Sequence, residues 1–424
     1  MSRYDVLLTG AETHQGIVVM RSLYQRGVRT LVTSDNPRSI GFYSKLKSGR
    51  ALLPSAVSQK EAFVDELLAL VEQYDIPHIY PVTETSLITL DEQRERVDNV
   101  AKLLAPSSET IRCGVDKKLT MEIARQEGVP IPSTLYPGST GEAKAFAEEH
   151  GYPVIFKPRG RSSDARIEGT FNFKVQYCHN RQELERFLSQ FADGVYPMMQ
   201  DYAYGPHTQF MCFVENGREV HSCFQDQMVR MLPMTGGVGA RRLSCEIVPK
   251  VHDWSTRMFF AMNWEGCAQT QWKGPDENGR YTFLEVSVRI IASIGSVVCS
   301  GIDHPWMHYQ YFTGQQVDRA DTFQVGKHSR WFRGDTITVT RHLIGDMPKA
   351  ADPLPPRYRV FLSWLYDFVR PGLNNDVERF SDPIPGLIEV SSLVIDLMRI
   401  VRRRVTDKLP VLRSIKHRLV GDSG

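Results

Sequence analysis

The most restrictive feature of this sequence is a short apolar stretch with three polar side chains at alternate positions. The stretch runs from Tyr281 to Asp303, and its first residues have the composition of a buried strand. Glu285, Ser287 and Arg289 fall at every second position, so on a strand all three point to one face. A carboxylate, a hydroxyl and a guanidinium at the end of a buried strand are costly to desolvate unless a ligand or an ion binds them. An internal ion pair in a sheet is the alternative, and the spacing alone does not decide between the two.

Composition places the chain among ordinary globular proteins. Its 424 residues are 42% hydrophobic and 24% charged, with a formal net charge of +2. At about 100–200 residues per domain, this length predicts roughly three domains. The seven cysteines form no C-x-x-C pair, and together with a polar N-terminus they favour a reducing cytoplasm. No apolar run reaches the roughly 18 residues that a membrane-spanning helix needs.

The first hundred residues have the alternation of a doubly wound α/β domain. Asp5–Thr33 predicts a strand, a glycine-flanked loop at Gly10–Gly16, a helix and a second strand. A similar unit follows at Phe63–Val82, and we expect the domain to end near Pro106. Such a loop can bind a phosphate at the start of its helix. Because GAETHQG misses the G-x-G-x-x-G spacing, a dinucleotide site, and with it a dehydrogenase, is not expected.

The next hundred residues contain two lysines at the borders of predicted elements. Lys117 opens a helix that ends at Gly128, and the prolines that follow force an extended chain. After a helix at Gly141–Glu149, the segment GYPVIFKP predicts a strand that ends at Lys157.

In order and spacing, these and later segments resemble the ATP-grasp proteins, and more narrowly the predicted ATP-grasp carboxylate–amine ligases, over most of the chain. The matching segments are Asp116-Lys117 with the helix and G-V-P-I-P after it, Gly151–Pro158 with Lys157, Met199–Tyr202 with Gly205, Arg230 with Thr235–Val238, the strand with Glu285, Ser287 and Arg289, and Ser329–Asp335. Each segment alone is a weak signal, whereas their order makes the resemblance specific.

The resemblance implies a fold of class α/β with several parts. We expect a Rossmann-like pre-ATP-grasp domain followed by a two-lobed α+β ATP-grasp fold and a helical C-terminal extension. The expected boundaries are 1–108 for the first domain, 109–195 for the N-terminal lobe, 196–316 for the C-terminal lobe with the metal and phosphate strand, and 317–424 for the extension with its basic amphipathic tail.

The resemblance also implies an activity, ATP-dependent carboxylate–amine ligation. ATP converts a carboxylate into an acyl phosphate, an amine or related nucleophile displaces the phosphate, and Mg²⁺ and cationic side chains neutralise the developing charge. The implied nucleotide-binding residues are Lys117, Lys157, Gln200, Asp201, Tyr202 and His207. The implied metal ligands are Glu285, Gln271 and Ser287, and the implied catalytic residues are Arg289 and Arg230.

Four positions depart from the family pattern. Gln271 stands where a second metal-binding carboxylate is typical, Ser287 replaces an asparagine, and His207 replaces a ribose-binding glutamate. The phosphate-covering loop at 159–170 has only two glycines and three arginines. With fewer carboxylates the site should bind Mg²⁺ more weakly. The alternative function is therefore a nucleotide-binding but catalytically weak protein that acts as a sensor or scaffold.

Other polar residues have a structural interpretation beside the functional one. Four histidines lack the spacing of a metal site or a catalytic triad, which favours surface or structural roles. They are His14, His207, His221 and His304. Arg241-Arg242 would hold a substrate carboxylate or form a solvated turn pair, and both interpretations stay open. Trp264 and Trp272 flank a strand and are expected in the core.

The C-terminal hundred residues predict an amphipathic helix over Leu387–Val405 that ends in Arg402–Arg404. The tail beyond it adds Lys408, Arg413, Lys416 and Arg418. A basic amphipathic end is typical of peripheral contact with an anionic membrane or of a partner-protein contact, and a solvated face is the alternative. The small net charge and the absence of a motif argue against nucleic-acid binding. The expected partners are thus ATP and small-molecule or peptide substrates, in the cytoplasm or at its membrane surface.

Overall fold

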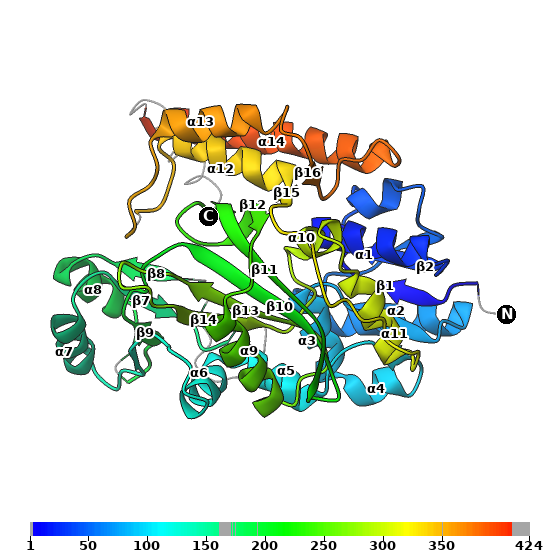
Figure 1. Ribbon diagram of the computed structural model, residues 1–424, viewed down its shortest axis with the longest axis horizontal. Coiled ribbons are helices and arrows are strands. Elements are labelled where there is room, and N and C mark those ends of the chain that lie inside the picture. Colours follow the sequence, from blue (N-terminus) through cyan, green and yellow to red (C-terminus); the bar gives the residue numbers. More distant parts are fainter. Residues whose placement is uncertain are drawn as a thin grey trace, which may run out of the picture.

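The computed structural model describes residues 3–160, 171, 173, 175–192, 194–349 and 351–408. Most of the predicted phosphate-covering loop (161–170) and the basic tail after Lys408 lie outside the described residues. Three sheets organise the described chain, and a layer of C-terminal helices packs against the largest of them (Figure 1).

The first sheet is parallel and forms the expected doubly wound α/β domain. Its order is β3-β2-β1-β4-β5, and β1 and β2 are buried along their whole length, as parallel strands covered by helices are. The strands are β1 Val6–Leu8, β2 Thr30–Ser34, β3 Gly49–Leu52, β4 His78–Tyr80 and β5 Lys102–Leu103. The helices are α1 His14–Gln25, η1 Ile40–Tyr43, α2 Lys60–Tyr74, α3 Glu84–Glu92 and α4 Arg94–Asp98.

The loop between β1 and α1 needs both of its glycines. Gly10 has a φ of +77°, which a residue without Cβ adopts without strain. A Cβ on Gly16 would lie 2.2 Å from the carbonyl oxygen of Gly10, so a side chain there does not fit. Thr13 caps α1, because its hydroxyl accepts the Gly16 N–H at 3.0 Å. The loop is therefore a compact turn that holds the start of α1 in place.

The second sheet is small, with the order β6-β9-β7-β8, and forms the N-terminal lobe. Its strands are β6 Thr134–Leu135, β7 Val154–Lys157, β8 Gln176–Cys178 and β9 Met198–Gln200, and helices α7 Thr140–His150 and α8 Arg181–Leu188 belong to the same lobe. The expected boundary after residue 195 puts β9 in the other lobe. Instead β9 pairs antiparallel with β7, with Gln200 opposite Ile155, so this strand belongs to the small sheet.

The third sheet has seven strands in the order β14-β13-β10-β11-β12-β15-β16. They are β10 His207–Glu215, β11 Glu219–Leu232, β12 Val238–Ser244, β13 Gly266–Lys273, β14 Thr282–Ser287, β15 His328–Arg330 and β16 Leu373–Asn375. The helices around it are α5 Ser108–Val115, α6 Lys117–Gln126, α9 Pro249–Ala261, α10 Ile294–Cys299 and α11 His304–Phe312. Trp264 and Trp272 are fully buried, as expected. Strand β14 ends at Ser287, so Arg289 lies just beyond the strand on which it was expected.

The C-terminal extension is built into the protein rather than appended to it. Strands β15 and β16 form the edge of the large sheet, and helices α12 Phe332–Ile344, α13 Arg357–Tyr366 and α14 Pro383–Lys408 follow them. The segment between α13 and α14 supplies buried carboxylates to the rest of the chain. Asp382 pairs with Arg21 of α1 at 3.0 Å, and Asp376 pairs with Arg242 of β12 at 2.6 Å. Among the described residues, no helix combines the length and the apolar character that crossing a membrane requires.

Candidate active site

Two adjoining cavities lie where the small sheet faces the seven-stranded sheet. The first has a volume of about 540 Å³ and the second about 530 Å³. Both are lined by Lys157 at the end of β7, Gln271 of β13 and Glu285 of β14, so these three side chains mark the junction. Ten of the eleven residues predicted for the site line one cavity or both. Arg230 is the exception.

The first cavity has polar groups that lack partners within the protein. Its lining includes Gln200, Asp201 and Tyr202 of the segment that links the two sheets, together with His207. The buried Oε1 atom of Gln200 and Nδ1 atom of His207 form no hydrogen bond among the described residues. Burial and the nearby charge of Lys273 lower the pKa of His207 to about 3, so its ring is neutral near pH 7. Leaving such groups unpaired costs about 1–3 kcal/mol each, and a heteroaromatic ligand with donor and acceptor atoms would satisfy them.

Lys157 is the cation at the junction. Burial lowers its pKa to about 8, with the charge of Lys117 acting in the same direction and the carboxylate of Glu285 opposing it. Lys117 lines the second cavity from the first turn of α6, and its backbone N–H donates to the Arg159 carbonyl at 3.0 Å. Asp116 holds Arg159 through two charged hydrogen bonds of 2.8 and 2.6 Å. With Arg289, three cationic side chains line the second cavity against the two carboxylates of Glu84 and Glu285, and this excess of positive charge favours an anionic ligand such as a phosphate chain.

The predicted metal ligands lie on two neighbouring strands. Gln271 and Glu285 are directly opposite each other across the β13–β14 ladder, and Ser287 lies opposite Gln269. A carboxylate, an amide oxygen and a hydroxyl are hard oxygen donors of the kind that Mg²⁺ prefers, so the residues present fit this ion. Glu285 is the single carboxylate of the three, so the expectation of weaker Mg²⁺ binding remains.

Arg289 lies at the far side of the second cavity, next to the N-terminal domain. Its Nη1 atom donates to the Ile290 carbonyl at 2.9 Å, and its Nε atom lies 3.9 Å from a carboxylate oxygen of Glu84 in α3. The N-terminal domain therefore contributes to the same cavity that holds the predicted metal and phosphate residues.

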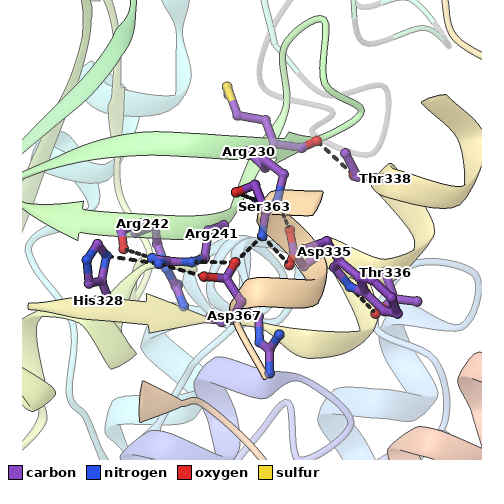
Figure 2. A network of polar contacts seen from close by, with 12 residues as sticks. Arg230, Arg241, Arg242, His328, Asp335, Thr336, Thr338, Ser363 and Asp367 are labelled. Atoms are coloured by element: carbon purple, nitrogen blue, oxygen red, sulfur yellow. Dashed lines mark hydrogen bonds and ion pairs between the residues drawn. The ribbon is translucent and has the colours of Figure 1, made fainter. Parts of the chain in front are cut away.

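Arg230 occupies a different position from the one predicted. It is buried in β11, and Figure 2 shows its guanidinium between the carboxylates of Asp335 and Asp367. The Nε and Nη2 atoms donate to Asp335 at 2.6 and 2.8 Å, Nη2 also donates to Asp367 at 2.5 Å, and Nη1 donates to Ser363 at 3.0 Å. Every nitrogen of the guanidinium is occupied, so this side chain is a structural anchor of the extension.

The two arginines after the Gly-Gly turn are also structural, and neither interpretation of them holds. Arg241 and Arg242 are buried in β12 rather than solvated in a turn. Arg241 donates to both carboxylate oxygens of Asp367 at 3.1 Å (Figure 2), and Arg242 pairs with Asp376. Because both guanidiniums already hold buried carboxylates of the chain, they are not available to a substrate.

Three of the four histidines, His14, His221 and His304, are buried, whereas His207 is partly exposed. His14 stacks on Trp331 with ring centroids 4.3 Å apart, and His304 contacts the Ser222 hydroxyl at 2.8 Å, both structural roles. His221 lies beside Glu215, and His207 lines the first cavity.

A group at the rim of the first cavity was missed by the sequence analysis. Lys273 of β13 contacts the Tyr202 hydroxyl at 2.6 Å and forms an ion pair with Asp352, and Tyr202 donates to Asp352 at 2.6 Å. Lys273 follows Gln271 at the two-residue spacing of a strand, which was the one available signal. Asp352 comes from the connection between α12 and α13, so the extension contacts the first cavity.

Comparison with known proteins gives distant relatives. No protein-family model matches the chain. It is 23% identical over 298 residues to the carbamoyl phosphate synthase large chain of Methanothermobacter thermautotrophicus, covering 66% of this chain and 26% of that protein. It is 21% identical over 289 residues to the pyruvate carboxylase of Komagataella pastoris, covering 63% and 23%. The chain spans between 15% and 50% of the length of the curated relatives that it matches.

Solved structures give a broader match. The biotin carboxylase domain of the Hydrogenobacter thermophilus 2-oxoglutarate carboxylase, in complex with MgADP and bicarbonate, is similar with a TM-score of 0.60, 16% identity, and coverage of 77% of this chain and 73% of that one. The Staphylococcus aureus N5-carboxyaminoimidazole synthetase with ADP gives a TM-score of 0.59, 13% identity, and coverage of 77% and 80%. These likenesses confirm that the chain has the ATP-grasp fold.

Proposed function

We propose that this protein is an ATP-dependent ligase that activates a carboxylate as an acyl phosphate, which an amine or related nucleophile then displaces. The observation that carries the proposal is the convergence of Lys157, Glu285 and Gln271 at the junction of two cavities, with Arg289 lining the second. The likeness to a carbamoyl phosphate synthase, and to a biotin carboxylase domain and a synthetase that were both solved with ADP, supports the same class of reaction.

In this proposal the first cavity holds the nucleotide base and ribose. The unpaired Gln200 Oε1 and His207 Nδ1 atoms give it polar contacts, while Ile155, Met231 and Leu284 provide apolar walls. The triphosphate extends toward the junction, where Lys157 and Lys117 neutralise its charge. Glu285, with Gln271 and Ser287, would hold Mg²⁺, which when bound offsets negative charge on the phosphate oxygens.

Phosphoryl transfer then needs position and charge rather than covalent chemistry from side chains. A carboxylate oxygen of the substrate forms a bond to the γ-phosphorus, the bond between that phosphorus and the bridging oxygen breaks, and ADP departs. In this proposal Arg289, which lines the second cavity, would bind oxygens of the transferring group with its planar guanidinium. The amine next attacks the acyl carbon, a C–N bond forms, inorganic phosphate leaves, and one N–H proton is released.

Trapping of the acyl phosphate tests this proposal. Purified protein, ATP and Mg²⁺ are incubated with a panel of carboxylates and hydroxylamine, and ADP and hydroxamate are quantified together. We expect at least one carboxylate to give stoichiometric ADP and hydroxamate, and Lys157→Met to lower that rate at least a hundredfold. The matched control Lys250→Met, on the exposed start of α9, should leave the rate unchanged. ATP binding without ADP or hydroxamate across the panel would contradict the ligase proposal.

The sensor or scaffold alternative rests on Gln271 and Ser287, which reduce the charge available to Mg²⁺. Gln271→Glu with Ser287→Asn separates the two functions. In a ligase that is already active, the double substitution changes turnover little. In a protein that has lost efficient catalysis, the double substitution raises nucleotide affinity in the presence of Mg²⁺, because it adds a carboxylate at the junction. Isothermal titration with ATP and Mg²⁺ measures that affinity.

We also propose that the C-terminal helices dock this enzyme on an anionic membrane from the cytoplasmic side. Among the described residues, fifteen of the 25 exposed large hydrophobic side chains lie between Tyr358 and Val401, on α13, α14 and their connection. Every exposed charged side chain over 357–404 is an arginine. They are Arg357, Arg359, Arg399, Arg402 and Arg403. The seven cysteines, none of which is in a disulfide, are compatible with a reducing cytoplasm.

The two helices present these side chains together. Both α13 and α14 pack on α12, and Arg357 at the start of α13 and Arg404 near the end of α14 lie beside Gly345, so the helices run in opposite directions over α12 (Figure 1). An apolar surface bordered by arginines matches the boundary between acyl chains and anionic headgroups.

Co-sedimentation with vesicles tests the membrane contact. We expect binding to vesicles with 30% phosphatidylserine, weaker binding to pure phosphatidylcholine, and loss of binding when Leu362→Glu and Leu387→Glu are combined. Leu52→Glu, an exposed leucine of β3, is the matched control. Equal sedimentation of the double variant and the unmodified protein would contradict this contact.

A further inference from the structure

A separate cavity of about 290 Å³ lies beside the edge strands β15 and β16 and shares no lining residue with the two cavities of the active site. Its wall includes Arg330 of β15, Asn375 of β16, and the phenylalanines Phe332 and Phe368. Arg330 belongs to the segment Ser329–Asp335, which resembles the family pattern but supplies no residue to the active-site cavities. The ligase proposal therefore leaves this cavity and its arginine without a ligand.

Arg330 differs from the other buried arginines of the described chain. Five arginine side chains are at most 5% exposed, and four of them form ion pairs with buried carboxylates, namely Arg21, Arg230, Arg241 and Arg242. Arg330 is 4% exposed and forms no ion pair among the described residues. The carboxyl groups of Asp335, Asp367 and Glu378 attract it only from beyond ion-pair distance. Because a buried charge without a counter-ion is costly, an anionic ligand would stabilise this guanidinium.

The guanidinium of Arg330 is held in place by contacts that leave part of it available. Its Nε atom donates to the side-chain oxygen of Asn375 at 2.9 Å. The ring centroids of Phe332 and Phe368 lie 4.9 and 5.2 Å from its central carbon. Its buried Nη1 atom has no hydrogen-bond partner among the described residues. A fixed, planar guanidinium with an unused donor suits the oxygens of a phosphate or a carboxylate.

Positive charge exceeds negative charge around this cavity. Arg370 also lines it, and its Nε atom donates to Asp367 at 2.8 Å. Asp367 accepts from Arg230 and Arg241 as well, so one carboxylate serves three arginines. With Arg330 included, four arginines face three carboxyl groups, and this count treats every acid as ionised. The surplus favours an anion in the cavity.

Glu378 is the third of these carboxyl groups, and it opposes an anion less than a free carboxylate would. Burial raises its pKa, and the nearby charge of Asp376 acts in the same direction. Its side chain forms a hydrogen bond with Glu389, whose pKa burial also raises. The two carboxyl groups therefore favour a shared proton over two negative charges.

The rim of the cavity is apolar and exposed. Phe368 is 54% exposed and Val369 next to it is 74% exposed. Arg370 lies over the ring of Tyr366, which is 50% exposed, with 4.4 Å between its central carbon and the ring centroid. These side chains belong to the apolar surface of the proposed membrane contact. A soluble anion would use none of this surface, whereas a phospholipid has an anionic phosphate and acyl chains side by side.

We propose that this cavity binds the phosphate of an anionic phospholipid. Arg330 and Arg370 would hold the phosphate oxygens, and the acyl chains would lie along the exposed apolar side chains beside Phe368. The volume is at the lower end of the range for small-molecule sites, which fits a headgroup phosphate better than a whole lipid. The inference rests on the proposed membrane contact and adds to it a defined headgroup site.

Titration calorimetry with soluble short-chain lipids, below their micelle concentrations, tests the inference. The probe is phosphatidylglycerol, whose only charged group is the phosphate. We expect it to bind one site at least tenfold more tightly than phosphatidylcholine with the same chains, and at least tenfold more tightly than inorganic phosphate. Equal binding of phosphatidylcholine would mean an apolar surface without a headgroup site, and equal binding of inorganic phosphate would mean a site for soluble anions. Either result, or no binding of phosphatidylglycerol, would overturn the inference.

Variants assign the binding to this cavity. Arg330→Gln should weaken phosphatidylglycerol binding at least tenfold, and Arg370→Gln at least threefold, with the fold checked by circular dichroism. Arg330→Lys keeps the charge without the planar fork, so its loss should be intermediate. The matched control is Arg50→Gln, an exposed arginine of β3 that lies over the rings of Phe42 and Tyr43, and it should bind the lipid normally. Unchanged affinity in Arg330→Gln, or in Arg370→Gln should Arg330→Gln not fold, would overturn the assignment.

The vesicle assay keeps this inference apart from the membrane contact on which it rests. Sedimentation of the unmodified protein with anionic vesicles, without phosphatidylglycerol binding that depends on Arg330, contradicts only the headgroup site. Failure of the unmodified protein to sediment with those vesicles contradicts the membrane contact itself, whatever the calorimetry gives.

Discussion

The buried ion network around Asp367 should contribute strongly to stability and not to chemistry. Asp367→Asn keeps the shape of the side chain and removes its charge. In the folded protein this carboxylate accepts from Arg230 and Arg241 (Figure 2), and also from Arg370. After the substitution Arg230 still has Asp335, whereas Arg241, which is 2% exposed, is left without a carboxylate and keeps a carbonyl, a histidine nitrogen and at most the amide oxygen of the new side chain.

The magnitude follows from the charge left behind. Breaking a buried pair by removing one partner typically costs about 3–5 kcal/mol, because the other charge is buried without compensation. With a urea dependence of about 2–3 kcal/mol per M, the midpoint of unfolding should fall by roughly 1–2 M. The exposed pair Asp253–Arg257 is the control, and Asp253→Asn should cost about 1 kcal/mol or less.

A double-mutant cycle separates the pair from its surroundings. Adding Arg241→Met to Asp367→Asn removes the uncompensated charge, so the double variant should be more stable than the sum of the two single effects predicts. A chain of this length commonly unfolds in more than one transition, so the free energy is read from the transition in which α12 and α13 lose amide protection. A cost for Asp367→Asn no larger than for Asp253→Asn, or simple additivity in the cycle, would refute this reasoning.

The pH dependence gives a second check on the same residue. Hydrogen bonds from Arg241 and Arg230 hold the pKa of Asp367 below its ordinary value, against the opposing effect of burial. A carboxylate with a lowered pKa in the folded state stabilises the protein above its unfolded pKa of about 3.9 and loses that contribution as the pH falls. The difference in stability between the unmodified protein and Asp367→Asn should therefore be full at pH 7 and shrink below about pH 4.

Three further predictions concern the two cavities. Burial lowers the pKa of Lys157 to about 8, so ATP affinity should be constant below pH 8 and fall by about tenfold per pH unit above it. Titration calorimetry measures this affinity, and Lys157→Arg should remove its pH dependence. Glu285→Gln removes the single carboxylate among the predicted metal ligands, so the Mg²⁺ concentration for half-maximal ADP formation should rise at least tenfold, and an unchanged requirement would exclude Glu285 as a ligand. Lys273→Met frees Asp352 and Tyr202 at the rim, so KM for ATP should rise severalfold with kcat little changed, and a selective fall in kcat would contradict a role in nucleotide binding.

The sequence predicted those site residues whose side-chain direction depends on one short segment alone. Lys157 ends a strand of four residues, and Glu285 and Ser287 alternate on another, so local periodicity fixes where each side chain points. The α/β pattern of the first domain is equally local. The position of β9 does not follow from local sequence, because a strand of only three residues pairs with whichever neighbouring strand the fold brings beside it.

Arg230 shows why the remainder could not be predicted. Its partners Asp335 and Asp367 lie 105 and 137 positions further along the chain. A buried arginine and a phosphate-binding arginine have the same local sequence requirements, and only the distant carboxylates distinguish them. Lys273 has the same difficulty, since its partner Asp352 comes from a connection whose sequence predicts no element.

The position of these distant partners makes the C-terminal extension part of the site. Asp367, Asp376 and Asp382 lie in one segment, and each neutralises an arginine buried in another part of the protein. The extension also reaches the cleft, because Asp352 contacts Tyr202 and Lys273 in the lining of the first cavity. A shortened chain without residues 345–408 would leave Arg21, Arg241 and Arg242 without their carboxylates, at a cost of about 3–5 kcal/mol for each broken pair. Loss of activity in such a chain would therefore report instability, and catalytic competence has to be judged on the full chain.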